Sequence, residues 1–280
     1  MHRWRDKLTL VGVIHKSRIK LLVPMVVAVI NLKQLKLTAL GRGLSLPIQE
    51  RSGIRKVDRF LGNIFFQKKN IQVYQALANL VVGNKKRPII IVDWTKLPNV
   101  NEYALRAAVA AEGRAITIYE EVHPKKKEGN AKVHRLFLRR LKSMYPEDCI
   151  PIIVTDAGFK NPWFRAVLAL SWDYVGRVRG LTQYDAGNGY QQISTLFPEA
   201  TKIPTSLGEI QLAKENPFKT LAYLVRNKLV GRKRLTKGGM VRRDKDSTNY
   251  GKNYREPWLL VSSLKSFSAA NKVYKIYLCT

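Results

Sequence analysis

The spacing of apolar residues changes along the chain near residue 86. Residues 1–85 carry apolar side chains at helical spacing, with a break rich in glycine, serine and proline at 43–47. From residue 88 onward, short apolar runs of strand length alternate with longer amphipathic segments. We therefore expect a helical region over 1–85 and a separate region of mixed α/β structure over 86–280.

The mixed region has a recognisable order of elements. Periodicity predicts strands over 88–93, 103–110 and 115–121, a helix over 132–145, a strand over 150–155, a helix over 161–170 and a strand over 173–179. This order predicts a mixed sheet with helices packed on it, as in a ribonuclease-H-like core. Residues 181–256 alternate strand-like pieces with basic, glycine-rich turns, which predicts a β-rich insertion. A strand at 257–263 and a helical pattern from 268 follow.

The helical region contains two short predicted helices on either side of the break at 43–47. Their basic residues are Arg42, Arg55, Lys56 and Arg59. Two short helices around a turn that contains glycine are typical of a DNA-binding helical region, and we expect these four side chains to contact DNA. An ordinary pair of surface helices has the same pattern and stays open as an alternative.

The charge balance points to a polyanionic partner. Fifty Lys and Arg residues against twenty Asp and Glu residues give a formal net charge of +30. Such an excess favours nucleic acid, with an affinity that falls steeply as salt rises, because bound counterions are released. A ribosomal or merely basic protein would share this composition.

The cysteines and the longest apolar stretch limit the cellular locations that the sequence suggests. Cys149 and Cys279 are the two cysteines and form no metal-binding spacing, which argues against a disulfide scaffold and against a zinc site. The apolar stretch at 21–30 is bounded by Lys20 and Lys33 and is too short to span a bilayer. We expect a cytoplasmic, nucleoid-associated protein without a membrane partner.

Two aspartates follow apolar runs of strand type. Asp93 comes directly after 88–92 and Asp156 directly after 150–155. An acid at the end of a buried strand is rigidly held yet faces solvent, as a metal site requires, and carboxylate oxygens suit Mg²⁺ or Mn²⁺. Two carboxylates from adjacent strands can share two such ions for phosphoryl transfer. A helix cap or turn is the alternative role for each residue.

Several motifs together resemble one family. They are Asp93-Trp94-Thr95, 155–159, 162–164, 172–179, 255–260, 37–42 and 57–63. This combination resembles bacterial insertion-sequence transposases of the DDE type, in the branch whose ribonuclease-H-like core carries a β-rich insertion. The resemblance implies a DNA transposase that binds terminal inverted repeats and target DNA. It also implies cleavage and strand transfer with two Mg²⁺ or Mn²⁺ ions, and a homodimer assembled on DNA.

The resemblance assigns roles to further residues. Asp93 and Asp156 become the first two acids of the metal triad. Trp258 matches the tryptophan that stacks on a base flipped from the transposon end, a contact for which an indole ring is suited. Arg177 and Arg179 alternate on one face of the predicted strand at 173–179, which makes them candidates for binding phosphates near the metals. A core tryptophan and surface salt bridges are the competing roles.

The sequence departs from the family pattern at its end. Tyr277 falls where the signature tyrosine belongs, but only 278–280 follow, without the arginine, glutamate and lysine of the signature. We therefore expect a truncated chain that lacks the catalytic glutamate and is inactive in cleavage, and we do not expect Glu256 to substitute. A DNA-binding competitor or regulator of the full-length transposase is the alternative function.

Overall fold

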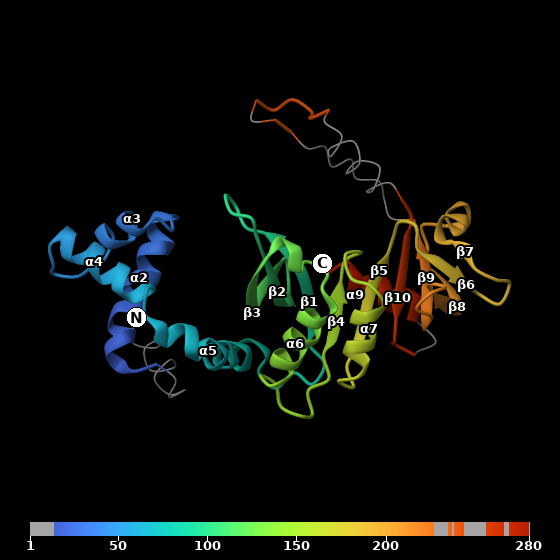
Figure 1. Cartoon of the computed structure of the whole chain (residues 1–280), viewed down its shortest axis with the longest axis horizontal. Helices are drawn as coiled ribbons and strands as arrows, with labels where there is room; N and C mark the ends of the chain where they lie inside the picture. Colours follow the sequence, from blue (N-terminus) through green and yellow to red (C-terminus); the bar gives the residue numbers. More distant parts are fainter. Residues whose placement is uncertain (1–13, 227–234, 237, 244–255, 266–268, 280) are drawn as a thin grey trace. The chain divides into compact units, whose positions relative to one another are not determined.

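The computed structural model describes residues 14–226, 235–236, 238–243, 256–265 and 269–279 (Figure 1). The chain forms two compact units, Met1–Leu80 and Val81–Thr280. The predicted basic turns at 227–234 and 244–255 lie outside the described residues.

The first unit is helical, as the periodicity predicts. Its helices are α2 (Lys16–Leu32), α3 (Leu37–Arg42), α4 (Glu50–Leu61) and α5 (Ile64–Val82). A small apolar core joins α2, α3 and α4 through Met25, Ala28, Leu40, Leu44 and Val57. Helices α3 and α4 cross at two glycines: a methyl group on Gly41 would collide with Ile54, and one on Gly53 would collide with the carbonyl of Gly41. The absence of side chains at these two positions allows the close crossing.

The second unit is built on one ten-stranded sheet in the order β3-β2-β1-β4-β5-β10-β9-β8-β6-β7. Only the pairs β1–β4 and β4–β5 are parallel among the strands of the described chain. The strands are β1 (Ile89–Lys96), β2 (Glu102–Ala111), β3 (Arg114–Pro124), β4 (Ile152–Thr155), β5 (Asp173–Val178), β6 (Gln183–Asp185), β7 (Gln191–Gln192), β8 (Thr205–Leu212), β9 (Phe218–Val225) and β10 (Trp258–Ser262).

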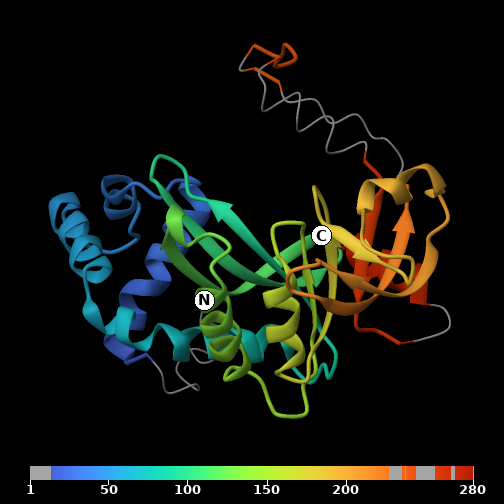
Figure 2. The ribbon, with the colours of Figure 1, turned by 45° about the vertical axis from the view of Figure 1, so that its right-hand side comes forward.

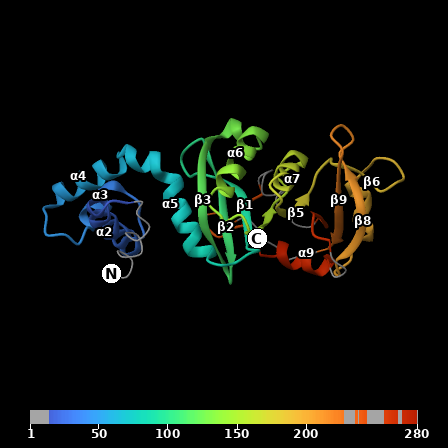
Figure 3. The ribbon, with the colours of Figure 1, turned by 90° about the horizontal axis from the view of Figure 1, so that it is seen from below.

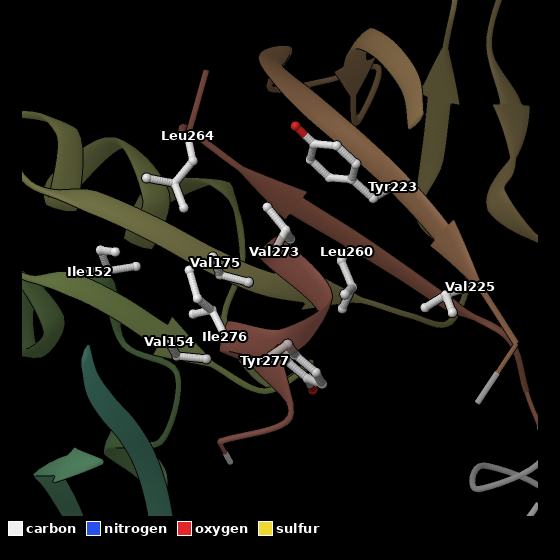
Figure 4. Packing of buried hydrophobic residues seen from close by; sticks show 10 residues of the cluster. All are labelled: Ile152, Val154, Val175, Tyr223, Val225, Leu260, Leu264, Val273, Ile276 and Tyr277. Atoms are coloured by element: carbon white, nitrogen blue, oxygen red, sulfur yellow. The ribbon is translucent and has the colours of Figure 1, made fainter. Parts of the chain in front are cut away.

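Helices cover both faces of this sheet. The helices are α6 (Ala131–Lys142), α7 (Asn161–Leu168) and α9 (Ala269–Tyr277), with short 3₁₀ turns at Lys125–Lys127 and Ile193–Glu199. Helices α6 and α7 lie on one face and α9 lies on the other (Figure 3). The side chains of Val273, Ile276 and Tyr277 place α9 against β4, β5 and β10, where they join a buried apolar cluster (Figure 4).

The predicted mixed sheet with packed helices is confirmed, and the first five strands have the order expected of a ribonuclease-H-like core. The β-rich segment extends this same sheet, because β10 returns between β5 and β9 (Figure 2). In the described part of the chain, no helix combines the length and the apolar character needed to cross a membrane.

Candidate active site

Asp93 and Asp156 come together on neighbouring parallel strands. Strands β1 and β4 pair in a register that sets Val92 opposite Thr155. Asp93 is the next residue of β1, and Asp156 directly follows the last residue of β4. The Asp156 carboxylate accepts a hydrogen bond of 2.8 Å from the backbone N–H of Gly158, which fixes it in a tight turn. The sequence predicts both positions, and the sheet places them side by side.

The pKa of Asp93 shows that the two carboxylates influence each other. Loss of hydration, and after it the negative charge of Asp156, raises the pKa of Asp93 from 3.8 to about 6. Arg106 on β2 lies opposite Asp93 and acts in the other direction, although its guanidinium also binds Glu120 at 2.5 Å. A cation placed between the two carboxylates would relieve their repulsion.

A cationic and aromatic cluster lies near Asp156. The Arg177 guanidinium carbon lies 5.3 Å from the centre of the Trp258 ring, and Tyr277 packs edge-on against that ring with centroids 5.2 Å apart. Burial raises the pKa of Tyr277 to about 12, although a hydrogen bond from Arg177 opposes this shift. The charge of Asp156 acts on both Arg177 and Tyr277, so the cluster and the aspartates share one electrostatic environment.

Trp258 has features of both of its predicted roles. It is partly buried and packs against the apolar cluster beneath α9, as a core tryptophan would. Among the described residues, its buried indole N–H has no hydrogen-bond acceptor. Its ring nevertheless lies beside Arg177, close to the acids.

Arg179 is engaged in an ion pair. Its Nη2 and Nε atoms donate to one carboxylate oxygen of Glu256 at 3.0 and 3.2 Å. The competing salt-bridge role is therefore present for Arg179, and Glu256 is directed to this arginine.

Behind the aspartates lies a buried aromatic group that the sequence analysis missed. The indole N–H of Trp94 donates to Nε2 of His134 at 3.0 Å, and the His134 ring stacks on Phe159. Burial lowers the pKa of His134 from 6.5 to about 4. Helical spacing could have found it, because positions 134, 137, 138 and 141 share the buried face of α6.

The four basic residues predicted in the helical unit divide into two pairs. Arg42 binds Glu50 at 3.3 Å, and Arg55 is exposed outside the groove described next. Lys56 and Arg59 of α4 instead line a groove together with basic residues of α2. This groove of about 470 Å³ is lined by Ser17, Arg18, Lys20, Leu21, Leu46, Lys56, Arg59, Phe60 and Asn63.

A family comparison identifies the family to which this fold belongs. The sequence model of the family described as transposase DDE domain matches residues 84–277, which includes both aspartates and every strand of the sheet. The chain belongs to the DDE transposase family. The resemblance predicted from the sequence is thereby confirmed, together with the ribonuclease-H-like fold class.

Other comparisons are distant. No curated protein sequence matches this transposase-family chain. Two crystal structures of Marinitoga piezophila Argonaute are similar, one with a 5′ OH guide RNA (9% identity, TM-score 0.29) and one with guide RNA and target DNA (10% identity, TM-score 0.28). Each alignment covers 79% of this chain, which spans only 31% of the Argonaute chain.

The donors present fit a divalent ion in part. DDE transposases generally use divalent metal ions. Asp93 and Asp156 offer hard carboxylate oxygens from neighbouring strands, and the pKa of Asp93 is raised first by burial and then by the negative charge of Asp156. Within the described residues, no group of three or more His, Cys, Asp or Glu side chains gathers at one point.

Proposed function

We propose that this protein acts in DNA transposition by binding the terminal inverted repeats of an insertion sequence and supporting divalent-metal-dependent cleavage and strand transfer. The observation that carries the proposal is the side-by-side placement of Asp93 and Asp156 on parallel strands β1 and β4. Membership of the DDE transposase family supports the same chemistry.

The aspartates would hold Mg²⁺ or Mn²⁺, with two ions expected in the family site. When bound, such ions activate an attacking oxygen and stabilise the leaving oxygen in an in-line phosphoryl transfer. Asp93 and Asp156 supply the ligands, and the turn at Gly158 keeps the Asp156 carboxylate in place. The ionised form of Asp93 is the ligand, so binding would compete with the proton that its raised pKa favours.

DNA contact near the acids is assigned to Trp258 and Arg177. The Trp258 ring offers a flat surface for a displaced base, and Arg177 places positive charge beside that ring. Base–aromatic stacking contributes about 1–3 kcal/mol per base, which is enough to hold an unpaired nucleotide. Arg179 would support this surface through its ion pair with Glu256.

A second contact with duplex DNA is assigned to the helical unit. The groove between α2 and α4 gathers the charges of Arg18, Lys20, Lys56 and Arg59 in one place. Such a cluster suits the phosphate backbone of duplex DNA. The proposal includes a homodimer assembled on DNA, because transposition pairs two ends, and a nucleoid-associated location.

A regulator that binds DNA without cutting it is the second candidate. The pairing of Glu256 with Arg179 favours this candidate, because this glutamate is then directed away from a role as a further metal ligand. Under this function the chain would compete for transposon ends.

The test uses labelled duplexes taken from both flanks of the gene and a scrambled duplex of equal length. We expect preferential binding of the flanking DNA, measured by fluorescence anisotropy. Any Mn²⁺-dependent strand cleavage should be lost in Asp93→Asn and in Asp156→Asn. Glu147→Gln, which changes an exposed carboxylate elsewhere, is the matched control. Specific binding without cleavage would support the regulator, and equal binding of both duplexes would refute both functions.

A further inference from the structure

His134 lies where it can hold both aspartate-bearing segments. It is buried, at 4% exposure, on the face of α6 that packs against the sheet. Among its aromatic neighbours are Trp94, which follows Asp93 directly, and Phe159, which is three residues after Asp156. One side chain on a helix thus contacts the two segments that carry the acids.

The contact with β1 is directional. The Trp94 indole N–H donates to Nε2 of His134 at 3.0 Å. An indole nitrogen can only donate, so Nε2 must be unprotonated and the imidazole proton must lie on Nδ1. Successive side chains of a strand point to opposite faces, so this bond anchors β1 from the face opposite to the Asp93 carboxylate.

The contact with the loop after β4 is made through ring stacking. The His134 ring lies 5.1 Å from the Phe159 ring at an interplanar angle of 28°, and 5.0 Å from the Trp163 ring in an edge-on arrangement. Phe159 and Trp163 also contact each other, with centroids 4.6 Å apart, and both are buried. The stacking of His134 on Phe159 therefore holds the end of the segment that begins at Asp156.

We propose that His134 is a positioning residue that sets the spacing of the Asp93 and Asp156 carboxylates through Trp94 and Phe159. This inference rests on the proposed metal-dependent function. An apolar side chain of similar size at position 134 would preserve the packing on Phe159. It would lose the acceptor for Trp94, and β1 would lose its anchor at the residue next to Asp93.

The experiment compares the affinity for Mn²⁺ alone, measured from free Mn²⁺ by electron paramagnetic resonance. Supporting interactions behind metal ligands typically change metal affinity by about 10- to 100-fold. We expect His134→Leu to weaken binding by about tenfold, at the lower end of that range because the effect passes through backbone. His134→Gln, whose side-chain carbonyl can accept the indole N–H, should recover most of this loss.

Trp94→Phe removes the same hydrogen bond from the other side. It should match His134→Leu, and the double variant should lose little more than either single variant, because both remove one shared interaction. Urea unfolding of each variant identifies any that fail to fold. If His134→Leu does not fold, the Mn²⁺ affinities of Trp94→Phe and His134→Gln are compared instead.

The outcomes separate the two proposals. Mn²⁺ binding that survives Asp93→Asn would refute the metal site itself. Binding that is lost in Asp93→Asn but unchanged in both His134→Leu and Trp94→Phe would refute the positioning role alone. Equal losses in His134→Leu and His134→Gln, or fully additive losses in the double variant, would also overturn it, because they would show that packing alone matters.

Discussion

Replacing Asp93 with asparagine should stabilise the metal-free protein at neutral pH while removing its function. The pKa of Asp93 is raised from 3.8 to about 6, first by loss of hydration and then by Asp156. The Asp93 carboxyl group therefore binds its proton more tightly in the folded chain than in the unfolded chain. The favourable contribution of Asp93 is complete below pH 3.8 and is lost as the pH rises through about 6.

The magnitude follows from the shift and the exposure of the residue. A shift of this size corresponds to about 3 kcal/mol in full. Asp93 as a residue is exposed, even though its carboxylate is partly desolvated, so solvent screening reduces this figure. We expect Asp93→Asn to raise the free energy of unfolding by about 1 kcal/mol at about pH 7.5, and the gain to shrink at about pH 4.5.

The assay is urea unfolding in the presence of a chelator at both pH values, with Glu147→Gln as the control for removing an exposed negative charge. Saturating Mn²⁺ should reverse the order of stability, because the ion binds only the folded wild type. An Asp93→Asn protein that is destabilised equally at both pH values in chelator would refute this reasoning.

Four further results are expected. Burial lowers the pKa of His134 from 6.5 to about 4. The contribution of neutral His134 to stability is therefore complete above pH 6.5, and it falls as the pH drops from 6.5 to about 4. Asp93 titrates in the same pH range and acts in the opposite direction, so the two proteins are compared with each other. Between about pH 7 and pH 5, wild type should lose about 2 kcal/mol of unfolding free energy relative to His134→Gln, measured in urea. Gly176→Ala would place a methyl group 2.5 Å from the Phe164 ring, and thermal unfolding should show a cost of about 1–3 kcal/mol, unless the ring can shift freely. Gly53→Ala should separate α3 from α4 and reduce helical content in circular dichroism, because its methyl group meets the Gly41 carbonyl. Arg59→Ala should reduce the salt dependence of DNA affinity by about one unit of slope, whereas Arg42→Ala should change it less, since Arg42 is paired with Glu50.

Local sequence pattern was enough to predict the elements that carry the aspartates. The runs before Asp93 and Asp156 are apolar and rich in isoleucine and valine, so their strand character is a local property. The chain leaves β1 through the antiparallel strands β2 and β3, and α6 then brings it back so that β4 pairs with the other side of β1. This is the strand order that the predicted ribonuclease-H-like core implies.

Other features depend on contacts between distant residues. The place of β10 between β5 and β9 joins segments about 80 and 40 residues apart in the chain, and no local signal encodes such a pairing. The ion pair of Arg179 with Glu256 follows from that pairing. Helical spacing can place His134 on the buried face of its helix, but its contacts with Trp94 and Phe159 join other elements and have no local signal.

The measurement that tests the central claim most directly is nuclear magnetic resonance of the isotope-labelled protein during Mn²⁺ addition. A bound Mn²⁺ ion broadens the amide signals nearest to it. The account predicts that the signals of Trp94, Ala157 and Gly158 disappear first, and that Asp93→Asn together with Asp156→Asn abolishes this effect. Broadening centred on another carboxylate group, such as Glu120 and Glu121 on β3, or unchanged broadening in the double variant, would contradict it.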